Sequence, residues 1–215
     1  MKKIFCNLVL LVILQLTYCT ESASQQKKIN KHIGGNCEGC EAIYENTIPF
    51  KDLDHVDTLP GFGSAGEKIM ISGVVYKKDG KTPAKDVILY VYHTDQTGVY
   101  PTKGDEKGWG RRHGYIRGWM KTNEKGEYKF YTFRPASYPN SSNPQHIHIT
   151  LKEPDKNEYW IDDFHFLDDP LVTERMKNND RKRGGSGFLQ LQKGNGIKTA
   201  TRNIILGMNV EDYPE

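Results

Sequence analysis

The sequence predicts an all-β sandwich, and three observations support this prediction. The 215-residue chain is rich in Gly, Tyr and Phe, with 21, 12 and 8 copies, and aromatic residues favour strands while Gly favours turns. It has no long stretch rich in Ala, Leu, Glu and Lys, which is the composition of long helices. Short segments with strand-like patterning alternate with turn signals, which is typical of a sandwich with about seven strands.

Composition and charge narrow the class of protein further. With 36% hydrophobic residues, 11% aromatic residues and a mean hydropathy of −0.69, the chain is too aromatic for a disordered polymer and too polar for a membrane bundle. The formal net charge is +3. Without Lys2 and Lys3 it falls to about +1, which leaves no electrostatic case for nucleic-acid binding. We expect one soluble domain of roughly 190 residues.

Residues 1–24 have the pattern of a signal peptide. Two lysines precede the apolar stretch 4–16, which is too short to span a bilayer. Two cleavage modes are open. Residues 16–19 resemble a bacterial lipobox that would place a lipid on Cys19, whereas residues 22–24 form an ordinary cleavage site. Either way we expect an exported protein of the periplasm or cell envelope, which touches a membrane only through a lipid anchor.

Residues 25–66 show little periodicity, and we expect an extended N-terminal arm that wraps the core. The arm contains Cys37 and Cys40. A four-thiolate zinc site lacks its second cysteine pair, haem attachment needs a His where Glu41 stands, and a thioredoxin-like redox pair needs a βαβ context. In an oxidising compartment, we expect the two cysteines to form a small disulfide that pins the arm.

Residues 67–215 are assigned to the sandwich domain. Two turns in it have clear signals, at Asp79 and Gly80 and at residues 123–126. Residues 127–133 alternate polar and aromatic side chains with period two, as a strand requires. The expected strands are 69–76, 87–93, 118–122, 127–133, 147–152, 159–166 and 199–207.

Two histidines on one expected strand give the first sign of a metal site. His146 and His148 are two residues apart, so both imidazoles leave the same face of the strand and can bind one metal ion. The alternative is that one is buried with a backbone partner and the other is incidental. Tyrosine phenolates are hard anionic donors, and two of them with two histidines would suit Fe(III). Because the chain has 12 tyrosines, spacing alone does not select the pair.

Four runs of residues, in this order, resemble the intradiol ring-cleavage dioxygenases, particularly the protocatechuate 3,4-dioxygenase type. They are residues 117–118, 122–130, 134–139 and 144–148, and the resemblance covers residues 68–170. It implies a transthyretin/prealbumin-like β-sandwich with a non-haem Fe(III) held by two tyrosines and two histidines. Carried over by motif, the ligands are Tyr100, Tyr138, His146 and His148, while Tyr92 and Tyr115 also stand in the region of Tyr100.

The resemblance also implies the reaction. Such an enzyme opens a catechol ring between its two hydroxylated carbons and places both atoms of O2 in the product. It implies Tyr138 as the catalytic residue, which takes a proton from the substrate and leaves as a phenol. Members of the family usually associate, so an oligomer is open here, with the arm as one candidate for an interface. The particular catechol is not set by the sequence.

Two departures from the family pattern fall near the histidines. Asn143 stands where the family commonly has an Arg, so a cation is missing at that position, and the segment between Tyr138 and His146 is shorter. The candidates to replace that cation are Arg111, Arg112, Arg117 and Arg134. We therefore expect an altered substrate pocket. The residues expected to contact the substrate are Arg112, Tyr115, Asn143 and Gln145.

Three rival interpretations stay open. His146 and His148 with Glu153 imitate the first half of a cupin metal motif. However, no second half follows, and the odd spacing puts Glu153 on the opposite strand face from His148. The chain also resembles transthyretin-like sandwich modules, which serve for binding or spacing and need no metal ligands. A weakly active metal-binding relative is the third. The His pair after Tyr138 favours the dioxygenase, because a spacer has no use for it.

Overall fold

The computed structural model describes residues 32–63 and 66–215. The predicted signal peptide 1–24, with Cys19, lies outside the described residues, as does the start of the predicted arm. None of the helices in the described part of the chain is long and apolar enough to cross a membrane.

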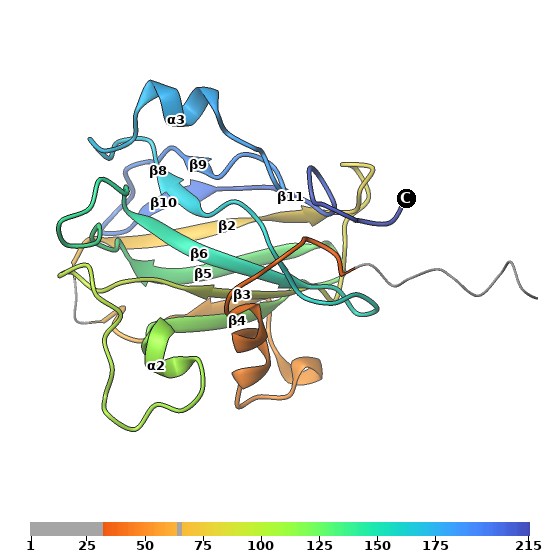
Figure 1. The fold of residues 1–215 in the computed structure, drawn as a ribbon, viewed down its shortest axis with the longest axis horizontal. Coiled ribbons are helices and arrows are strands. Elements are labelled where there is room, and N and C mark those ends of the chain that lie inside the picture. The colour runs from red at the N-terminus through yellow and green to blue at the C-terminus, as the bar shows by residue number, and fades with distance from the viewer. Residues whose placement is uncertain (1–31, 64–65) are drawn as a thin grey trace, which may run out of the picture. The chain divides into compact units, whose positions relative to one another are not determined.

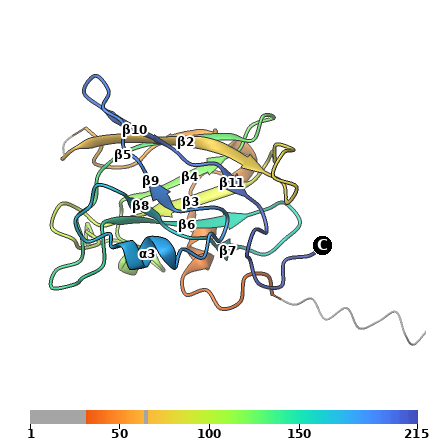
Figure 2. The same cartoon turned by 90° about the horizontal axis from the view of Figure 1, so that it is seen from above.

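Two β-sheets form the sandwich, as predicted, and Figure 1 and Figure 2 show them as two layers. The first sheet has the order β1-β5-β2-β10, and β11 also pairs with β2. Its strands are β1 (Val56–Thr58), β2 (Lys68–Tyr76), β5 (Glu127–Phe133), β10 (Lys198–Thr201) and β11 (Ile204–Ile205). Strands β2 and β5 are antiparallel, whereas β1, β10 and β11 each pair in parallel with a neighbour.

The second sheet carries the two histidines of the predicted metal site. Its order is β4-β3-β6-β8-β9, with β7 on β6. Its strands are β3 (Ile88–Tyr92), β4 (Arg117–Lys121), β6 (His146–Lys152), β7 (Tyr159–Trp160), β8 (Phe164–Phe166) and β9 (Phe188–Leu189). Antiparallel pairing of β6 with β3 places Tyr92 opposite His148, and pairing with β8 places His165 opposite His146.

Short helices in the connections cover the outer face of the second sheet. They are η1 (Cys40–Glu45), η2 (Phe50–Asp52), α2 (Gly110–His113) and α3 (Glu174–Asn178). Under the first three, Ile43, Leu53 and Tyr90 form an apolar cluster separate from the main core, with Trp109 and Trp119 packed against it. Figure 2 shows α3 beside β6, on the side away from β2.

The pleat of β6 divides its side chains between core and surface. Ile147, Ile149 and Leu151 are buried in the core between the sheets. His146 and His148 alternate with them and are half-buried on the outer face. This period-two alternation is the geometry predicted from the sequence, and it sends both imidazoles to one side of the sheet.

The predicted strands match the structure except where two of them are interrupted. The predicted strand 159–166 is divided into β7 and β8, and the predicted strand 199–207 is divided into β10 and β11. At the second break, a Cβ on Gly73 would lie 1.8 Å from the carbonyl oxygen of Arg202. Because Gly73 lacks a side chain, the chain can turn there directly against β2. The very short β1 and β9 were not predicted, since their pairing is long-range.

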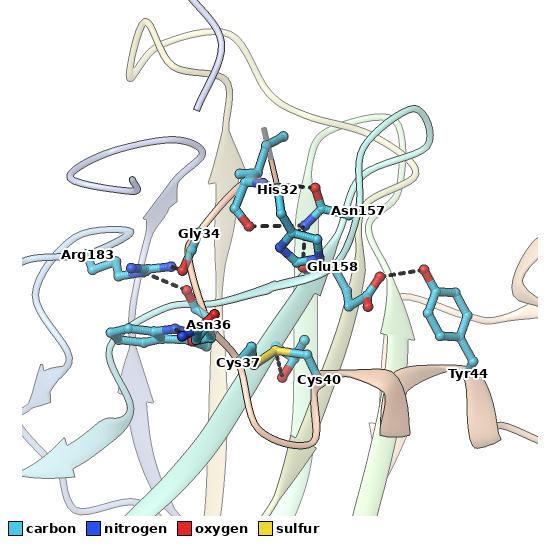
Figure 3. Close-up of a disulfide and its surroundings, with 12 residues drawn as sticks. His32, Gly34, Asn36, Cys37, Cys40, Tyr44, Asn157, Glu158 and Arg183 are labelled. Carbon is cyan, nitrogen blue, oxygen red and sulfur yellow. Dashed lines mark hydrogen bonds between the residues drawn. A yellow bond between two sulfur atoms is a disulfide. The ribbon is translucent and has the colours of Figure 1, made fainter. Parts of the chain in front are cut away.

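Part of the predicted arm is built into the sandwich. Residues 56–58 form β1, and residues 40–45 and 50–52 form helices. Further upstream, Ile33 N–H donates to Asn157 Oδ1 and Arg183 Nη2 donates to the carbonyl of Gly34 at 2.7 Å (Figure 3). Cys37 and Cys40 form a disulfide at the start of η1. The segment therefore contacts both sheets through specific pairing and hydrogen bonds rather than as a loose extension.

Candidate metal centre

Four side chains converge on the outer face of the second sheet. The Nε2 atoms of His146 and His148 are 3.2 Å apart, and the Tyr138 hydroxyl lies 3.1 Å from each. The Tyr100 hydroxyl is 2.8 Å from His148 Nε2 and also contacts the Tyr138 hydroxyl. We call these two phenol oxygens and two imidazole nitrogens the donor cluster. They are the four residues to which the family motif pointed.

The two tyrosines reach the cluster from loops that pack on each other. Tyr100 follows β3, and Tyr138 lies between β5 and β6. A Cβ on Gly98 would lie 2.1 Å from the carbonyl oxygen of Ser137, and Gly98 has a φ of +79°. Glycine at this position therefore lets the two loops approach closely. In addition, the carbonyl of Asp95 accepts a hydrogen bond from Ala136 N–H at 3.0 Å.

Both histidines are anchored at the nitrogen that faces away from the cluster. The Nδ1 atom of His146 lies 2.7 Å from the carbonyl oxygen of Pro144. The Nδ1 atom of His148 lies 3.1 Å from Oδ2 of Asp163. A carbonyl or carboxylate oxygen accepts a proton from Nδ1, and this leaves the Nε2 lone pair for the cluster. The arrangement is the one that metal-binding histidines commonly adopt.

Burial favours the neutral forms of these side chains. It lowers the pKa of His146 to about 4, so this imidazole is uncharged near neutral pH. Burial also raises the pKa values of Tyr100 and Tyr138. Both phenols therefore stay protonated unless a cation lies close to them, and a bound metal ion supplies that charge. Two phenol oxygens with two imidazoles are a donor set that fits Fe(III).

A stack of rings supports His148 from one side. Tyr92 lies between His148, at 4.6 Å between ring centroids, and His113, at 3.8 Å and 7° between ring planes. The hydroxyl of Tyr90 and Nδ1 of His113 are 2.8 Å apart. A Cβ on Gly39, inside the disulfide loop, would lie 2.8 Å from His113 Nε2. The sequence placed Tyr92 only as an alternative ligand and did not predict its stack with His113, because the stack joins segments far apart in the chain.

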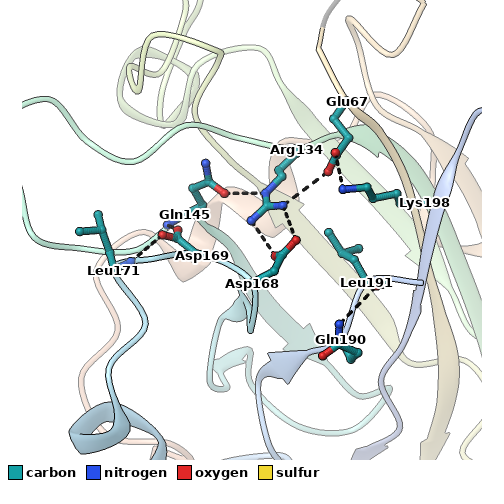
Figure 4. Close-up of polar contacts among 9 residues, drawn as sticks. All are labelled: Glu67, Arg134, Gln145, Asp168, Asp169, Leu171, Gln190, Leu191 and Lys198. Atoms are coloured by element: carbon teal, nitrogen blue, oxygen red, sulfur yellow. Dashed lines mark hydrogen bonds and ion pairs between the residues drawn. The ribbon is translucent and has the colours of Figure 1, made fainter. Parts of the chain in front are cut away.

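An ion-pair network holds the loop before His146 (Figure 4). Arg134 makes two hydrogen bonds to Asp168, at 2.8 and 2.9 Å, and its Nε donates to Gln145 Oε1. Asp169 Oδ2 accepts the backbone N–H of Gln145 at 2.7 Å. Gln145 is thus engaged in positioning the start of β6, and its predicted contact with the substrate stays a prediction.

The other predicted substrate contacts lie away from the donor cluster. Arg112 is exposed and pairs with Glu38, Tyr115 packs against the core with Lys103 over its ring, and Asn143 is exposed on its loop. Within residues 32–63 and 66–215, no hydrogen bond joins these side chains to the four donor atoms. The remaining candidates to replace the missing arginine are also engaged elsewhere. Arg117 pairs with Glu45, and Arg111 donates to the carbonyl of Glu106.

A cavity of about 370 Å³ opens beside the histidines. Its floor includes Asp163 and His165, and His165 stacks on His146 with ring centroids 5.7 Å apart. Trp160 and Phe188 form aromatic walls, and α3 supplies Arg175. The cavity therefore adjoins the outer side of the metal centre.

The described residues thus form a β-sandwich in which His and Tyr donor atoms converge on the outer face of one sheet. Residues 44–184 match the family model described as Dioxygenase. The chain belongs to the intradiol ring-cleavage dioxygenase family.

Individual relatives agree with this family. A stretch of 113 residues, 50% of this chain, is 28% identical to the protocatechuate 3,4-dioxygenase beta chain of Burkholderia cepacia and covers 48% of that protein. The chain thus spans about half the length of this curated relative.

Solved structures show the same fold. The dioxygenase domain of a dioxygenase carbohydrate-binding protein fusion from Streptomyces sp. SirexAA-E has a TM-score of 0.53 and 20% identity, over 75% of this chain and 94% of that one. Catechol 1,2-dioxygenase from Acinetobacter sp. ADP1 has a TM-score of 0.53 and 16% identity, over 70% of this chain and 56% of that one. The intradiol ring-cleavage dioxygenase of Tetranychus urticae has a TM-score of 0.51 and 17% identity, over 72% of this chain and 86% of that one.

Proposed function

We propose that this protein is a non-haem Fe(III) enzyme that uses O2 to cleave a catechol between its two hydroxylated carbons. The observation that carries the proposal is the donor cluster, in which the Tyr138 hydroxyl lies 3.1 Å from Nε2 of both His146 and His148 and the Tyr100 hydroxyl lies 2.8 Å from Nε2 of His148. Membership of the intradiol family supports it. When bound, Fe(III) supplies a Lewis acid that ionises the phenols and draws electron density from a catecholate.

Tyr138 is the residue that we propose takes the substrate proton. It lies on a loop beside the exposed residues Pro139 and Asn140, so its side chain can leave the cluster without breaking a strand. As a phenolate it accepts a proton from the catechol hydroxyl and departs as a neutral phenol. The raised pKa of Tyr138, caused by burial, favours that neutral form. His146 and His148, fixed on β6, stay in place during this exchange.

The experiment that tests the proposal is a visible absorption spectrum of the purified protein, with iron content, before and after catechol is added without oxygen. We expect a tyrosinate-to-Fe(III) charge-transfer band that moves to longer wavelength with catechol, followed by ring-cleaved diacid when O2 is admitted. A protein that stays colourless after reconstitution with iron contradicts the proposal and favours a transthyretin-like binding module. A coloured protein that does not turn over identifies a metal-binding relative with little activity.

We propose in addition that the protein is exported. The pattern of residues 1–24 supports this, and so does the disulfide between Cys37 and Cys40, since disulfides persist in oxidising compartments. Mass spectrometry of the mature N-terminus tests it. An N-terminus after Ala23 indicates ordinary cleavage, and a lipid on Cys19 indicates an anchored protein. An intact Met1 contradicts export.

A further inference from the structure

The two histidines of the donor cluster are held by acceptors of different charge. His146 Nδ1 faces a neutral backbone carbonyl, that of Pro144, whereas His148 Nδ1 faces the carboxylate of Asp163. Asp163 lies in the short connection between β7 and β8. The pairing of β8 with β6, in which His165 stands opposite His146, brings this connection alongside the histidines.

The backbone around Asp163 is held in place by residues 183–187 of the same chain. A Cβ on Gly187 would lie 2.1 Å from the carbonyl oxygen of Asp163, so only glycine allows this approach. The carbonyl of Gly187 then accepts from His165 N–H at 2.9 Å, and Asp162 Oδ2 accepts from Arg183 N–H at 2.8 Å. The Asp163 side chain therefore leaves a segment that is held on both sides of it.

The carboxylate of Asp163 makes its ion pair with His148. In the described part of the chain, no Lys or Arg lies within salt-bridge distance of it, and His148 is its ionic partner. Its neighbour differs, since Asp162 lies 3.9 Å from Arg181 Nε. The Asp163 side chain is 28% exposed and that of His148 is 24% exposed, so their contact is partly shielded from water. Such shielding makes the hydrogen bond stronger than one on an open surface.

An ionised carboxylate can only accept a hydrogen bond, and this decides which nitrogen of His148 carries the proton. With the proton on Nδ1, the lone pair stays on Nε2, which points at Tyr100 and Tyr138. We infer that Asp163 is a positioning residue that fixes the metal-binding tautomer and orientation of His148 and makes its Nε2 a stronger donor. The inference rests on the proposed metal centre, and it assigns Asp163 a role beside the ligands rather than among them.

A direct ligand role is the alternative, because Asp163, His146 and His148 offer ligand atoms within 4.8 Å of one another. The orientation of His148 favours the positioning role. Its Nε2 lies with the two phenols, while the carboxylate contacts Nδ1 on the other side of the ring. One metal ion cannot use both nitrogens of one imidazole. A metal bound by the phenols and Nε2 therefore leaves Asp163 to hold Nδ1.

The test compares Asp163→Asn with Asp162→Asn as the matched control. An amide either accepts from Nδ1 or donates to it, so Asp163→Asn no longer selects one tautomer. Long-range nitrogen–proton NMR of the metal-free protein, at mildly alkaline pH, should show one His148 tautomer in wild type and a mixture in Asp163→Asn. Competition with a chelator for Zn²⁺ should show that Asp163→Asn binds Zn²⁺ about 10 to 100-fold more weakly than wild type. Asp162→Asn keeps an amide oxygen that can accept from Arg183 N–H, so it should match wild type in both measurements, and Asp163→Glu should recover the single tautomer.

Two results would overturn the inference. One is Asp163→Asn with the wild-type tautomer and unchanged Zn²⁺ affinity. The other is a loss of metal in Asp163→Asn as complete as in His148→Ala, which would make Asp163 a ligand. Neither measurement needs iron, catechol or turnover. If the iron-loaded protein shows no tyrosinate band but Asp163→Asn still changes tautomer and Zn²⁺ affinity, the proposed function fails while the role of Asp163 stands.

Discussion

Strand β6 has a tyrosine cluster at each end, and the two clusters differ in how their charges are balanced. Near its start lies the donor cluster of Tyr100, Tyr138, His146 and His148. Just after its end, Glu153 is 6% exposed and accepts hydrogen bonds from Tyr159 and Tyr213 at 2.8 and 2.9 Å. Lys156 Nζ lies 3.1 Å from the same carboxylate. We call this second group the Glu153 cluster.

The difference between the clusters lies in the cation, and it is why we propose a metal ion at only one of them. In the Glu153 cluster an anion is matched by an ammonium group and two phenol donors, so the group is complete within the protein. In the donor cluster four atoms with lone pairs converge, and no Lys or Arg among residues 32–63 and 66–215 bonds to them. The comparison also contradicts the cupin interpretation, because Glu153 is engaged with tyrosines at the other end of the strand from His146 and His148.

The largest expected effect comes from removing a donor. His148→Ala should abolish the retention of stoichiometric iron, because it deletes the nitrogen that contacts both phenols. Iron content after dialysis and the visible spectrum measure this. Glu153→Gln, at the other end of β6, should keep its iron. If His148→Ala retains iron and activity, the assigned donor set is wrong.

The phenols allow a finer version of the same comparison. Tyr138→Phe should lower kcat on a catechol by at least about 10²-fold, because it removes a group that transfers a proton. Tyr213→Phe should leave kcat unchanged, since its hydroxyl contacts Glu153 alone among the described residues. Steady-state kinetics of both variants, corrected for iron content, provide the check. Equal kcat values for Tyr138→Phe and wild type would remove Tyr138 from the proposed proton transfer.

The Glu153 cluster should instead determine stability. Glu153→Ala leaves the hydroxyls of Tyr159 and Tyr213 without their acceptor and takes from Lys156 the more buried of its two carboxylate partners, and we expect a loss of about 4 kcal/mol in unfolding free energy. Denaturant unfolding measures it. The control is Glu158→Ala, because Glu158 bonds the exposed Tyr44 and should cost under about 1 kcal/mol. Similar losses of unfolding free energy in both variants would show that the buried Glu153 cluster stabilises the fold no more than an exposed hydrogen bond does.

A third histidine, His93, makes the stability of the fold depend on pH. His93 is fully buried between the carbonyl of Thr94 and the hydroxyl of Thr132, both at 2.7 Å. Burial lowers its pKa from 6.5 to about 4. As the pH falls below 6.5, the unfolded chain binds a proton on this histidine before the folded protein does. The free energy of unfolding is therefore highest above pH 6.5 and decreases until about pH 4. The loss is on the order of 3 kcal/mol.

His93→Gln should remove that contribution. Unfolding free energies measured across this pH range should then decline less steeply in the variant than in wild type. Parallel curves for the two proteins would mean that His93 does not couple folding to protonation.

The sequence predicted those parts of the site that depend on local geometry. The period of two in β6 was enough to place His146 and His148 on one outward face. The tyrosines came from the family resemblance, because no spacing relates Tyr100 to a loop 38 residues away. Asp163 was not predicted, since its position depends on the break between β7 and β8 and on the pairing of β8 with β6. The hydrogen bond between Gln145 and Arg134 was not predicted, because the two residues are 11 positions apart and lie on either side of a loop.

The pairing of β2 also determines when the molecule can fold. Its partners β10 and β11 come from residues 198–205, so they pair with residues about 130 positions earlier in the chain. Until they are synthesised, one edge of the nine-residue β2 stays open, and an open edge invites pairing with other chains. We expect folding in milliseconds to seconds and only after nearly the whole chain is made. A chain that stays unfolded this long can still pass through a narrow channel, and this would suit the proposed export.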